Sequence, residues 1–189
     1  MAKYSNLTLG QIEAIVNKIV MVGGPEGVKR LLADELAVVE VAPDTVYVDY
    51  SVRPNYPSWM SEVMHPELEA TGHYKFETKS LQLWLHPSQI AGGVTGQVIY
   101  NHLFRSNLLE SCLGLRDLEE IQKKGFAHFR KHFRGKTVFG WKSVVHRSGD
   151  DRLYVPWLVM DEGEVLLGWK WLGCTWDPGN PALRFADGK

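Results

Sequence analysis

Apolar residues near the N-terminus recur every three or four positions, a spacing typical of an amphipathic helix. They cover residues 9–21, directly after Thr8-Leu9-Gly10-Gln11, which has the Ser/Thr-x-x-Glu/Gln form of a capping box. Gly23-Gly24 ends this helix, and Pro25 is suited to the first position of a second helix that runs to about residue 35. These signals predict an N-terminal helical hairpin.

The middle of the chain mixes strand and turn patterns. Two runs rich in β-branched residues, 36–41 and 45–52, are separated by Ala42-Pro43-Asp44 and predict a β-hairpin. Residues 53–78 are the least regular stretch and form a possible looser segment. A strand is expected at residues 80–85, stopped by His86-Pro87, followed by a helix that Thr95 caps and that runs through Leu103.

One long amphipathic helix is predicted from about Leu115 to Phe133. Its apolar and polar residues separate onto two sides at 100° per residue. The apolar side carries Leu115, Leu118, Ile121, Gln122, Gly125, Phe126, Phe129 and Phe133. The opposite side carries Arg116, Glu120, Lys123, Lys124, Arg130 and Lys131. Such a helix is expected to bury its apolar side against a sheet.

The last third of the sequence predicts an antiparallel β-meander with strands at residues 137–146, 153–160 and 164–172. Pro156 falls inside the second strand, so it marks an edge position or a bulge. Residues 173–189 are expected to form an irregular flap over the sheet. The predicted fold class is α+β: an N-terminal helical hairpin, a mixed middle, and a long amphipathic helix packed on a C-terminal antiparallel β-meander. We predict one domain over residues 1–189.

Neither face of the third strand is cleanly polar. One face carries Val165, Leu167, Trp169 and Trp171, and the other carries Glu164, Leu166, Gly168, Lys170 and Leu172. Either helices and the C-terminal flap cover both faces, which is the preferred interpretation, or an apolar groove is open to a protein partner.

The composition is that of an ordinary globular protein, with 44% apolar and 23% charged residues in 189. The formal net charge of −1 means that any charged binding surface must be local. Two cysteines, no signal-peptide core and no apolar run of the roughly 20 residues that span a bilayer lead us to expect a cytoplasmic protein that does not enter membranes.

Two histidines stand four residues apart in the long helix, a spacing that allows both imidazoles to bind one metal ion. The glutamate of an HExxH motif is absent, however, and two cations occupy the space between His128 and His132. A third ligand would have to come from elsewhere, such as His86, His102 or Glu110. We predict ordinary boundary histidines and no metal.

No other motif predicts a cofactor or a catalytic group. Gly23-Gly24-Pro25-Glu26-Gly27 precedes a helix, but it follows a helix too and lacks the Walker lysine. The serines lack a GxSxG context, and Cys112 has apolar neighbours and no adjacent base. We therefore predict no cofactor, and whether the protein is an enzyme stays open.

The strongest local signal combines cations and an aromatic ring near the end of the long helix. The predicted ligand-binding residues are Lys123, Lys124, Arg130, Lys131, Arg134, Lys136, Trp141 and Lys142. Cations pair with phosphates and rings stack on bases, so this surface is suited to single-stranded nucleic acid or another polyanion. The alternative is a solvated helix face beside tryptophans of the core.

Five short motifs carry a resemblance to a known family. They are Gly23-Gly24-Pro25-Glu26-Gly27-Val28, Leu118-Glu119-Glu120-Ile121-Gln122-Lys123-Lys124-Gly125, Val138-Phe139-Gly140-Trp141-Lys142-Ser143-Val144, Trp169-Lys170-Trp171-Leu172 and Asn180-Pro181-Ala182-Leu183-Arg184-Phe185-Ala186. In these motifs the chain resembles a family of uncharacterised small proteins from uncultivated ultrasmall bacteria of the candidate phyla. The resemblance implies a bacterial protein and assigns no activity and no functional residue.

Three functional hypotheses follow from the sequence. The leading one is a binding module whose ligand, a single-stranded nucleic acid or another polyanion, meets the basic residues and the neighbouring sheet. The second is a small enzyme whose site is built from the loops at residues 53–78 and 86–95. The third is a subunit of a larger assembly that uses the C-terminal sheet as its interface. A pocket of converging polar groups, an open basic face or a large apolar patch would distinguish them.

Overall fold

The computed structural model describes residues 44–69 and 72–186 of the chain. The chain divides into two units, residues 1–42 and 43–189, and the described residues belong to the second. The helical hairpin expected at residues 9–35 and the strand expected at residues 36–41 lie outside the described residues. The single domain over the whole chain therefore stays a prediction.

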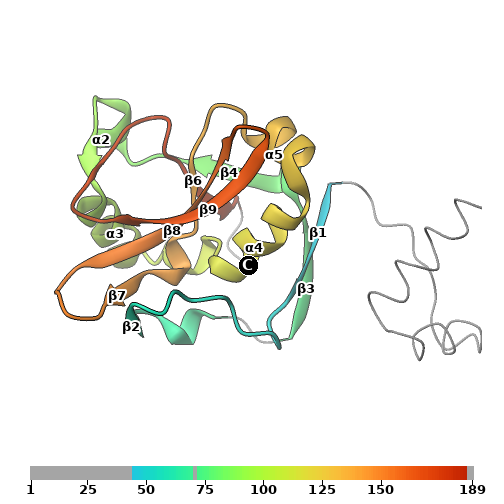
Figure 1. Ribbon diagram of the computed structural model, residues 1–189. Coiled ribbons are helices and arrows are strands. Elements are labelled where there is room, and N and C mark those ends of the chain that lie inside the picture. The colour runs from blue at the N-terminus through green and yellow to red at the C-terminus, as the bar shows by residue number, and fades with distance from the viewer. Residues whose placement is uncertain (1–43, 70–71, 187–189) are drawn as a thin grey trace, which may run out of the picture. The chain divides into compact units, whose positions relative to one another are not determined.

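A seven-stranded sheet organises the described residues (Figure 1). Its central strand β8 (Leu153–Asp161) pairs along one side with β9 (Glu164–Trp171). The other side of β8 is shared by β7 (Val145–Arg147) at one end and β6 (Val138–Phe139) at the other. The single strand predicted at residues 137–146 is thus two short strands, separated by one 3-10 turn.

Three further strands widen this sheet. β2 (Met60–Val63) pairs with β7, while β11 (Ala182–Phe185) lies between β6 and β4 (Leu81–Trp84). All pairings are antiparallel except β11 with β6. The expectation of an irregular C-terminal flap is therefore wrong at residues 182–185, because their backbone groups complete the sheet between two strands that are distant in sequence.

Two small antiparallel pairs stand beside the main sheet. β1 (Thr45–Asp49) pairs with β3 (His73–Glu77), and β5 (Val94–Thr95) pairs with β10 (Thr175–Trp176). The segment at residues 53–78, expected to be irregular, contributes both β2 and β3.

Four α-helices lie in the described part of the chain. They are α2 (Pro87–Ile90), α3 (Gly96–Arg105), α4 (Leu115–Lys123) and α5 (Gly125–Phe133). Four single-turn 3-10 helices accompany them: η1 (Pro66–Leu68), η2 (Thr78–Ser80), η3 (Leu109–Ser111) and η4 (Trp141–Ser143). The helix and the strand predicted on either side of His86-Pro87 are confirmed as α3 and β4.

The long helix predicted at residues 115–133 is two helices. Gly125 has a φ of +80°, in the left-handed region that glycine reaches without strain, and it separates α4 from α5. A glycine on the apolar side of a continuous helix would leave the period of the pattern unchanged, which is why the sequence predicts one helix. The break turns the direction of the chain, so that α4 and α5 pack on β9 as separate elements.

Pro156 lies in the centre of the sheet, not at an edge. The carbonyl of Pro156 accepts a hydrogen bond from the Gly140 N–H (3.0 Å), where the chain leaves the sheet as η4 between β6 and β7. In a strand, the nitrogen and the carbonyl of one residue point to the same side. The missing N–H of Pro156 therefore faces the gap between β6 and β7 and costs no ladder hydrogen bond.

One face of the β8–β9 hairpin is covered by α4 and α5. Val165 belongs to a core cluster that includes Ile121 of α4 and Phe129 of α5. Further along β9, the ring of Trp169 lies against Trp59, with 5.8 Å between ring centroids. Helices and the segment before β2 thus share the cover of this face.

The opposite face is also packed with tryptophan side chains. The ring of Trp157 lies over Gly168, its partner on β9, so closely that a Cβ at Gly168 would stand 2.3 Å from Cζ2 of the ring. Trp176, from the C-terminal tail, is fully buried in the same cluster as Val155 and Leu172. The preferred interpretation, that helices and the tail cover the sheet, is confirmed for these positions.

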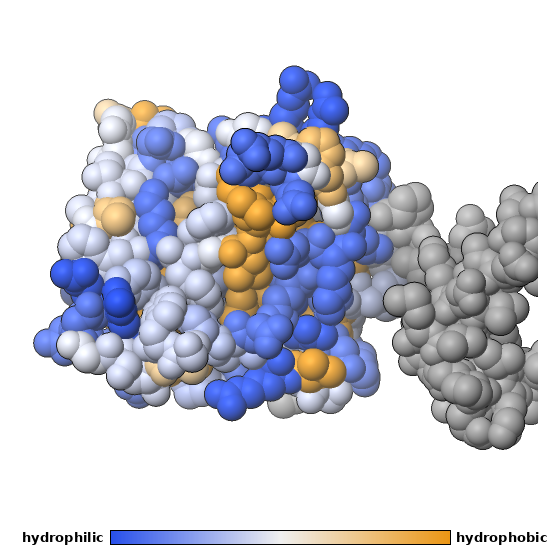
Figure 2. All heavy atoms as spheres, viewed as in Figure 1, coloured by the Kyte–Doolittle hydropathy of each residue, from blue (hydrophilic) through white to orange (hydrophobic). Residues whose placement is uncertain are grey.

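Few large apolar side chains of β9 remain in solvent. Leu166 and Trp171 are 38% and 40% exposed. In Figure 2, the face in view is largely polar and is crossed by one narrow apolar band. Scattered exposed apolar side chains are ordinary on a protein surface, so a protein partner at the C-terminal sheet stays a prediction.

The helix break gives a stability prediction. A Cβ at Gly125 would contact nothing within 4 Å, but the backbone conformation there is costly for alanine. Gly125→Ala should lower the free energy of unfolding in urea by about 1–2 kcal/mol. Gly125→Asn is the matched control and should lower it by less, because asparagine tolerates the left-handed region. An alanine variant as stable as the parent would contradict the left-handed conformation at this residue.

Candidate functional site

The cations of the predicted polyanion surface divide into paired and unpaired groups. The Lys123 ammonium pairs with Glu120 (2.7 Å), and the Lys131 ammonium pairs with Asp44 (2.6 Å). The Lys136 ammonium donates to the carbonyl of Pro178 (3.0 Å). The remaining four form no ion pair with another described residue; they are Lys124, Arg130, Arg134 and Lys142. Fewer than the seven predicted cations therefore lack a partner among the described residues, and Lys142 is only partly exposed.

The prediction that Trp141 binds the ligand is wrong. Its side chain is fully buried in η4, with ring centroids 6.3 Å from Phe139 and 5.7 Å from Trp176. A ring enclosed in the core cannot stack on a base. Trp141 therefore behaves as a large hydrophobic residue, and the predicted combination of cations with an accessible ring is absent at this position.

A buried carboxylate organises the start of α4. Asp117 is fully buried and accepts hydrogen bonds from the Gly114 N–H (2.7 Å) and from the hydroxyls of Tyr50 (2.9 Å) and Tyr74. Burial raises the pKa of Asp117, while these donors oppose the shift. Because three donors occupy its oxygens, the carboxylate ties β1 and β3 to α4, which is a structural role.

Two side chains that could act as nucleophiles, Cys112 and Tyr100, keep their protons because burial raises their pKa values. Burial raises the pKa of the Cys112 thiol to about 12. The Tyr100 hydroxyl lies 2.7 Å from Nε2 of His65, whose Nδ1 lies 3.2 Å from Glu67, but burial also raises the pKa of Tyr100. The adjacent cavity of about 190 Å³ is smaller than the roughly 300 Å³ at which ligand pockets begin. Neither group is an activated nucleophile.

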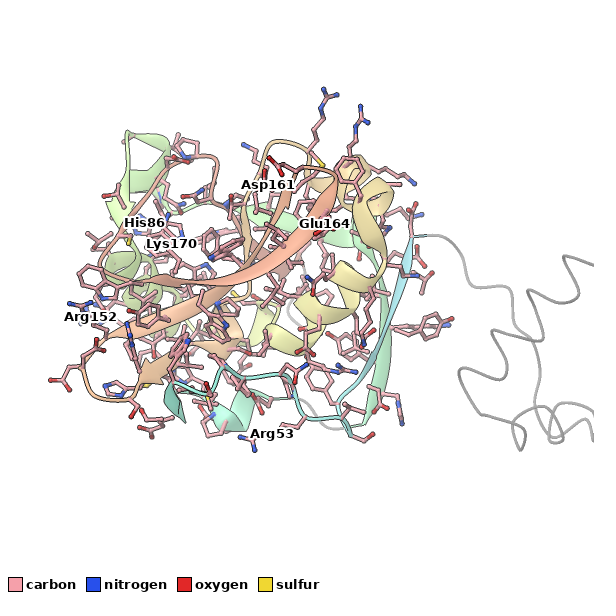
Figure 3. The ribbon with its side chains drawn as sticks, viewed as in Figure 1. Arg53, His86, Arg152, Asp161, Glu164 and Lys170 are labelled. Carbon is pink, nitrogen blue, oxygen red and sulfur yellow. The ribbon has the colours of Figure 1, made fainter. Side chains whose placement is uncertain are left out.

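A larger pocket of about 380 Å³ opens along α3. It is lined by His86, Val98, Asn101, His102, Arg105 and Ser106. The α3 residues follow the spacing i, i+3, i+4 and i+7, which places them on one helix face, and His86 comes from the start of α2. The labelled His86 of Figure 3 lies at the side of the domain where Figure 1 shows α2 and α3, away from α5.

The start of α2 holds His86 in place. The backbone N–H of His86 donates to Oε1 of Gln89 (2.9 Å), and the side-chain amide of Gln89 donates to the carbonyl of Asn180 (3.0 Å). Nδ1 of His86 accepts a hydrogen bond from the Ser88 N–H (3.1 Å). Nδ1 therefore carries no proton, and Nε2–H is the donor that the neutral ring has left.

Neighbouring contacts orient two further groups of the pocket. The ring of His102 stacks on Trp84 (5.7 Å between centroids) and meets the ring of His86 edge-on at 4.9 Å. Oδ1 of Asn101 accepts a hydrogen bond from the side-chain amide of Gln97 (3.0 Å), which leaves the Asn101 amide nitrogen as a donor. Together with the Arg105 guanidinium, the pocket presents mainly donors, and its lining contains no carboxylate.

Sequence patterns alone do not bring these residues together. His86 and His102 were expected only as possible partners of another histidine pair, and Asn101 and Arg105 were not expected at any site. Two signals were available in the sequence. Polar residues at 101, 102 and 105 share one helix face, and a histidine stands before a proline in the loop that precedes this helix. Periodicity shows which residues share a helix face, but only the fold shows that His86 reaches that face.

A second histidine pair, His128 and His132, lies beside the Asp44 carboxylate at the other end of the domain. Nε2 of His132 lies 3.0 Å from Oδ1 of Asp44, and Nδ1 of His128 lies 3.9 Å from the same oxygen. Hydrogen bonds from Lys131 and His132 lower the pKa of Asp44 to about 2. The group of three offers ligand atoms within 4.8 Å of one another. Asp44 differs from the third ligands expected from the sequence, which were His86, His102 and Glu110.

Comparisons with known proteins find no relative: no family model, no curated protein and no solved structure matches the chain. Within residues 44–69 and 72–186, no helix is long and apolar enough to cross a membrane.

The two histidine sites predict a pH dependence of stability. Burial lowers the pKa of His86 and of His128 below the ordinary value of 6.5. Below that pH the unfolded chain binds more protons than the folded chain, so the free energy of unfolding should fall as the pH drops from 7 towards 5. Asp44 acts in a separate window, between about 3.8 and about 2.

Urea unfolding at a series of pH values measures this slope. His86→Gln and His128→Gln should each flatten it between pH 7 and 5. Asn101→Ala, a non-titrating change in the same pocket as His86, should shift the curve without changing its slope. Unaltered slopes in both histidine variants would show that other groups control the acid side of the stability curve.

Proposed function

We propose that the protein is a binding protein for a phosphate-bearing or similarly compact anionic ligand, which it holds in the pocket of His86, Asn101, His102 and Arg105. The observation that supports this most is the set of converging donors without a carboxylate. The proposal keeps the anionic ligand class predicted from the sequence and moves the site from α5 to α3.

The chemistry of the lining favours an anion over a cation or a neutral ligand. The Arg105 guanidinium offers a planar set of N–H donors that matches phosphate and carboxylate oxygens. Nε2–H of His86 and the amide nitrogen of Asn101 add neutral donors whose other hydrogen-bonding atoms are already engaged. A ligand with several acceptor oxygens would satisfy all three residues at once.

The dimensions of the pocket agree with a small ligand or with one end of a larger one. A volume of about 380 Å³ lies within the range of roughly 300–1,000 Å³ of ligand pockets. A volume of this size accommodates a phosphate with the group that carries it and is too small for several nucleotides. A terminal phosphate or a small phosphorylated molecule therefore fits this site better than the interior of a polynucleotide.

The same geometry favours binding over catalysis. A general base must offer a free lone pair to the proton that it removes. In neutral His86 the lone pair is on Nδ1, which accepts the hydrogen bond from Ser88. The ring therefore serves as a hydrogen-bond donor to the ligand, and the enzyme alternative gains no general base from this residue.

A simpler role for the cations of α3 also has a physical basis. Arg105 and His102 lie in the last turn of the helix, where positive charge complements the partial negative charge of the C-terminal carbonyls. That role alone would not require His86 or the orientation of Asn101. Ligand binding distinguishes the two roles, because dipole complementation predicts no response to phosphate.

Titration with inorganic phosphate and with a nucleoside monophosphate tests the proposal. Backbone amide and histidine NMR signals of the pocket residues should shift with saturable dependence on concentration. Arg105→Ala should weaken binding about tenfold or more, because a hydrogen bond to a charged group contributes about 1.5–3 kcal/mol. Arg130→Ala is the matched control: it removes an exposed arginine that forms no ion pair with another described residue, and it should leave the affinity unchanged.

The same variants separate the pocket from the basic residues of α5. An oligonucleotide with a 5′ phosphate should bind more tightly than one without it, and Arg105→Ala should remove the difference. If binding depends on Arg130 and not on Arg105, the ligand occupies the basic surface predicted from the sequence. The absence of any shift at millimolar phosphate and nucleotide would contradict the pocket.

A further inference from the structure

We propose that Asp44, His128 and His132 form a binding site for a divalent transition-metal ion of the zinc type. The site does not rest on the proposed anion pocket, since it lies on α5 and at the start of β1, away from α2 and α3 (Figure 1). Spacing alone left the histidine pair without a third ligand, and the fold supplies a carboxylate from a distant part of the sequence.

The ligand atoms already lie close to the separations of a metal site. Zinc–nitrogen and zinc–oxygen bonds of about 2.0–2.1 Å in a tetrahedron place neighbouring ligand atoms about 3.3 Å apart. Oδ1 of Asp44 lies 3.0 Å from Nε2 of His132 and 3.9 Å from Nδ1 of His128. The widest separation of ligand atoms in the group is no more than 4.8 Å. Small side-chain rotations would therefore complete the coordination.

Local structure fixes each ligand. His128 and His132 are four residues apart on α5, with 4.8 Å between their ring centroids. Asp44 precedes β1, and its carbonyl accepts hydrogen bonds from the backbone N–H (3.0 Å) and the hydroxyl (3.1 Å) of Thr78, which follows β3. The β1–β3 pair therefore holds the carboxylate against the helix.

Thr78 also sets the tautomer of His128. Its hydroxyl donates to the Asp44 carbonyl, so its oxygen is left to accept a hydrogen bond from Nε2–H of His128, at 2.9 Å. The proton then lies on Nε2, and Nδ1 carries the lone pair that faces Asp44. Metal-binding histidines commonly donate their second N–H in this way, which fixes the orientation of the ring.

Without a metal ion, the Lys131 ammonium supplies the positive charge beside the Asp44 carboxylate. It lies 2.8 Å and 2.6 Å from the two carboxylate oxygens of Asp44. Its side chain is 58% exposed, so it can swing into solvent when an ion binds, and Nε2 of His132 must present a lone pair to coordinate the ion. Lys131 thus competes with the metal without blocking the imidazole ligands.

The donor set selects the class of ion. Two imidazole nitrogens and one carboxylate suit zinc, cobalt and nickel, whereas magnesium and calcium prefer oxygen ligands throughout. Three protein ligands leave a fourth tetrahedral position for water or an anion, as in sites where zinc is exchangeable or reactive.

Competition between the full-length protein and a chromogenic zinc chelator tests the site. The parent should bind one equivalent of Zn²⁺, and Asp44→Asn and His132→Gln should each weaken binding at least tenfold. His86→Gln and His102→Gln remove histidines of the anion pocket and should leave Zn²⁺ binding unchanged. Lys131→Ala should strengthen binding, because the competing ammonium is gone.

A second measurement covers a variant that fails to fold. Circular dichroism checks that each variant is folded. Because His128 is buried, His128→Gln can lose zinc through misfolding, so its result counts only if Asp44→Asn gives the same result. Asp44→Asn changes a partly exposed side chain and preserves its shape. Co²⁺ bound to the parent should give the visible absorption of a four-coordinate site, and Asp44→Asn should lose it. Stoichiometric binding that survives in folded Asp44→Asn and His132→Gln, weaker binding in Lys131→Ala, or no Zn²⁺ binding by the parent would overturn the proposal.

Discussion

The sheet depends on one constraint, the proline in its central strand. Because Pro156 has no N–H to offer on the side of β6 and β7, the neighbouring chain can leave the ladder there as η4. The departure carries Trp141 into the core and brings the Ser143 hydroxyl to the N–H of Leu115 (2.8 Å), at the first residue of α4. The hydrogen bond to Ser143 thus links the gap in the ladder to the start of α4, and Gly125 links α4 to α5.

The parts of the fold that the sequence predicts are those decided by local pattern. β4, β8, β9 and α3 all have a clear periodicity bounded by turn residues, and they are found where expected. The break at Gly125 was missed because a single glycine does not disturb the helical period. The strand at residues 182–185 was missed because its partners, β4 and β6, are remote in sequence. Burial of Trp141 depends on the same long-range packing, and its residue type allows either outcome.

In the candidate sites too, local sequence pattern predicts some residues and long-range packing decides the others. Residue spacing identifies His128 and His132 as neighbours, and it also places Asn101, His102 and Arg105 on one helix face. It cannot identify the residue that completes each group, because both come from other segments: one from the turn before β1 and the other from the start of α2. Functional groups that converge from separate elements therefore become visible only when the strand order is known.

The contact between Trp157 and Gly168 fixes more than local packing. Strands that are apolar on both faces, such as β8 and β9, can slide by two residues and still present suitable side chains to each face. Here such a slip would place Leu166 or Lys170 beneath the indole, where even a Cβ would lie 2.3 Å from a ring atom. A single residue without a side chain thus acts as a register lock, which adds to the alignment that the two-residue turn of the hairpin already favours.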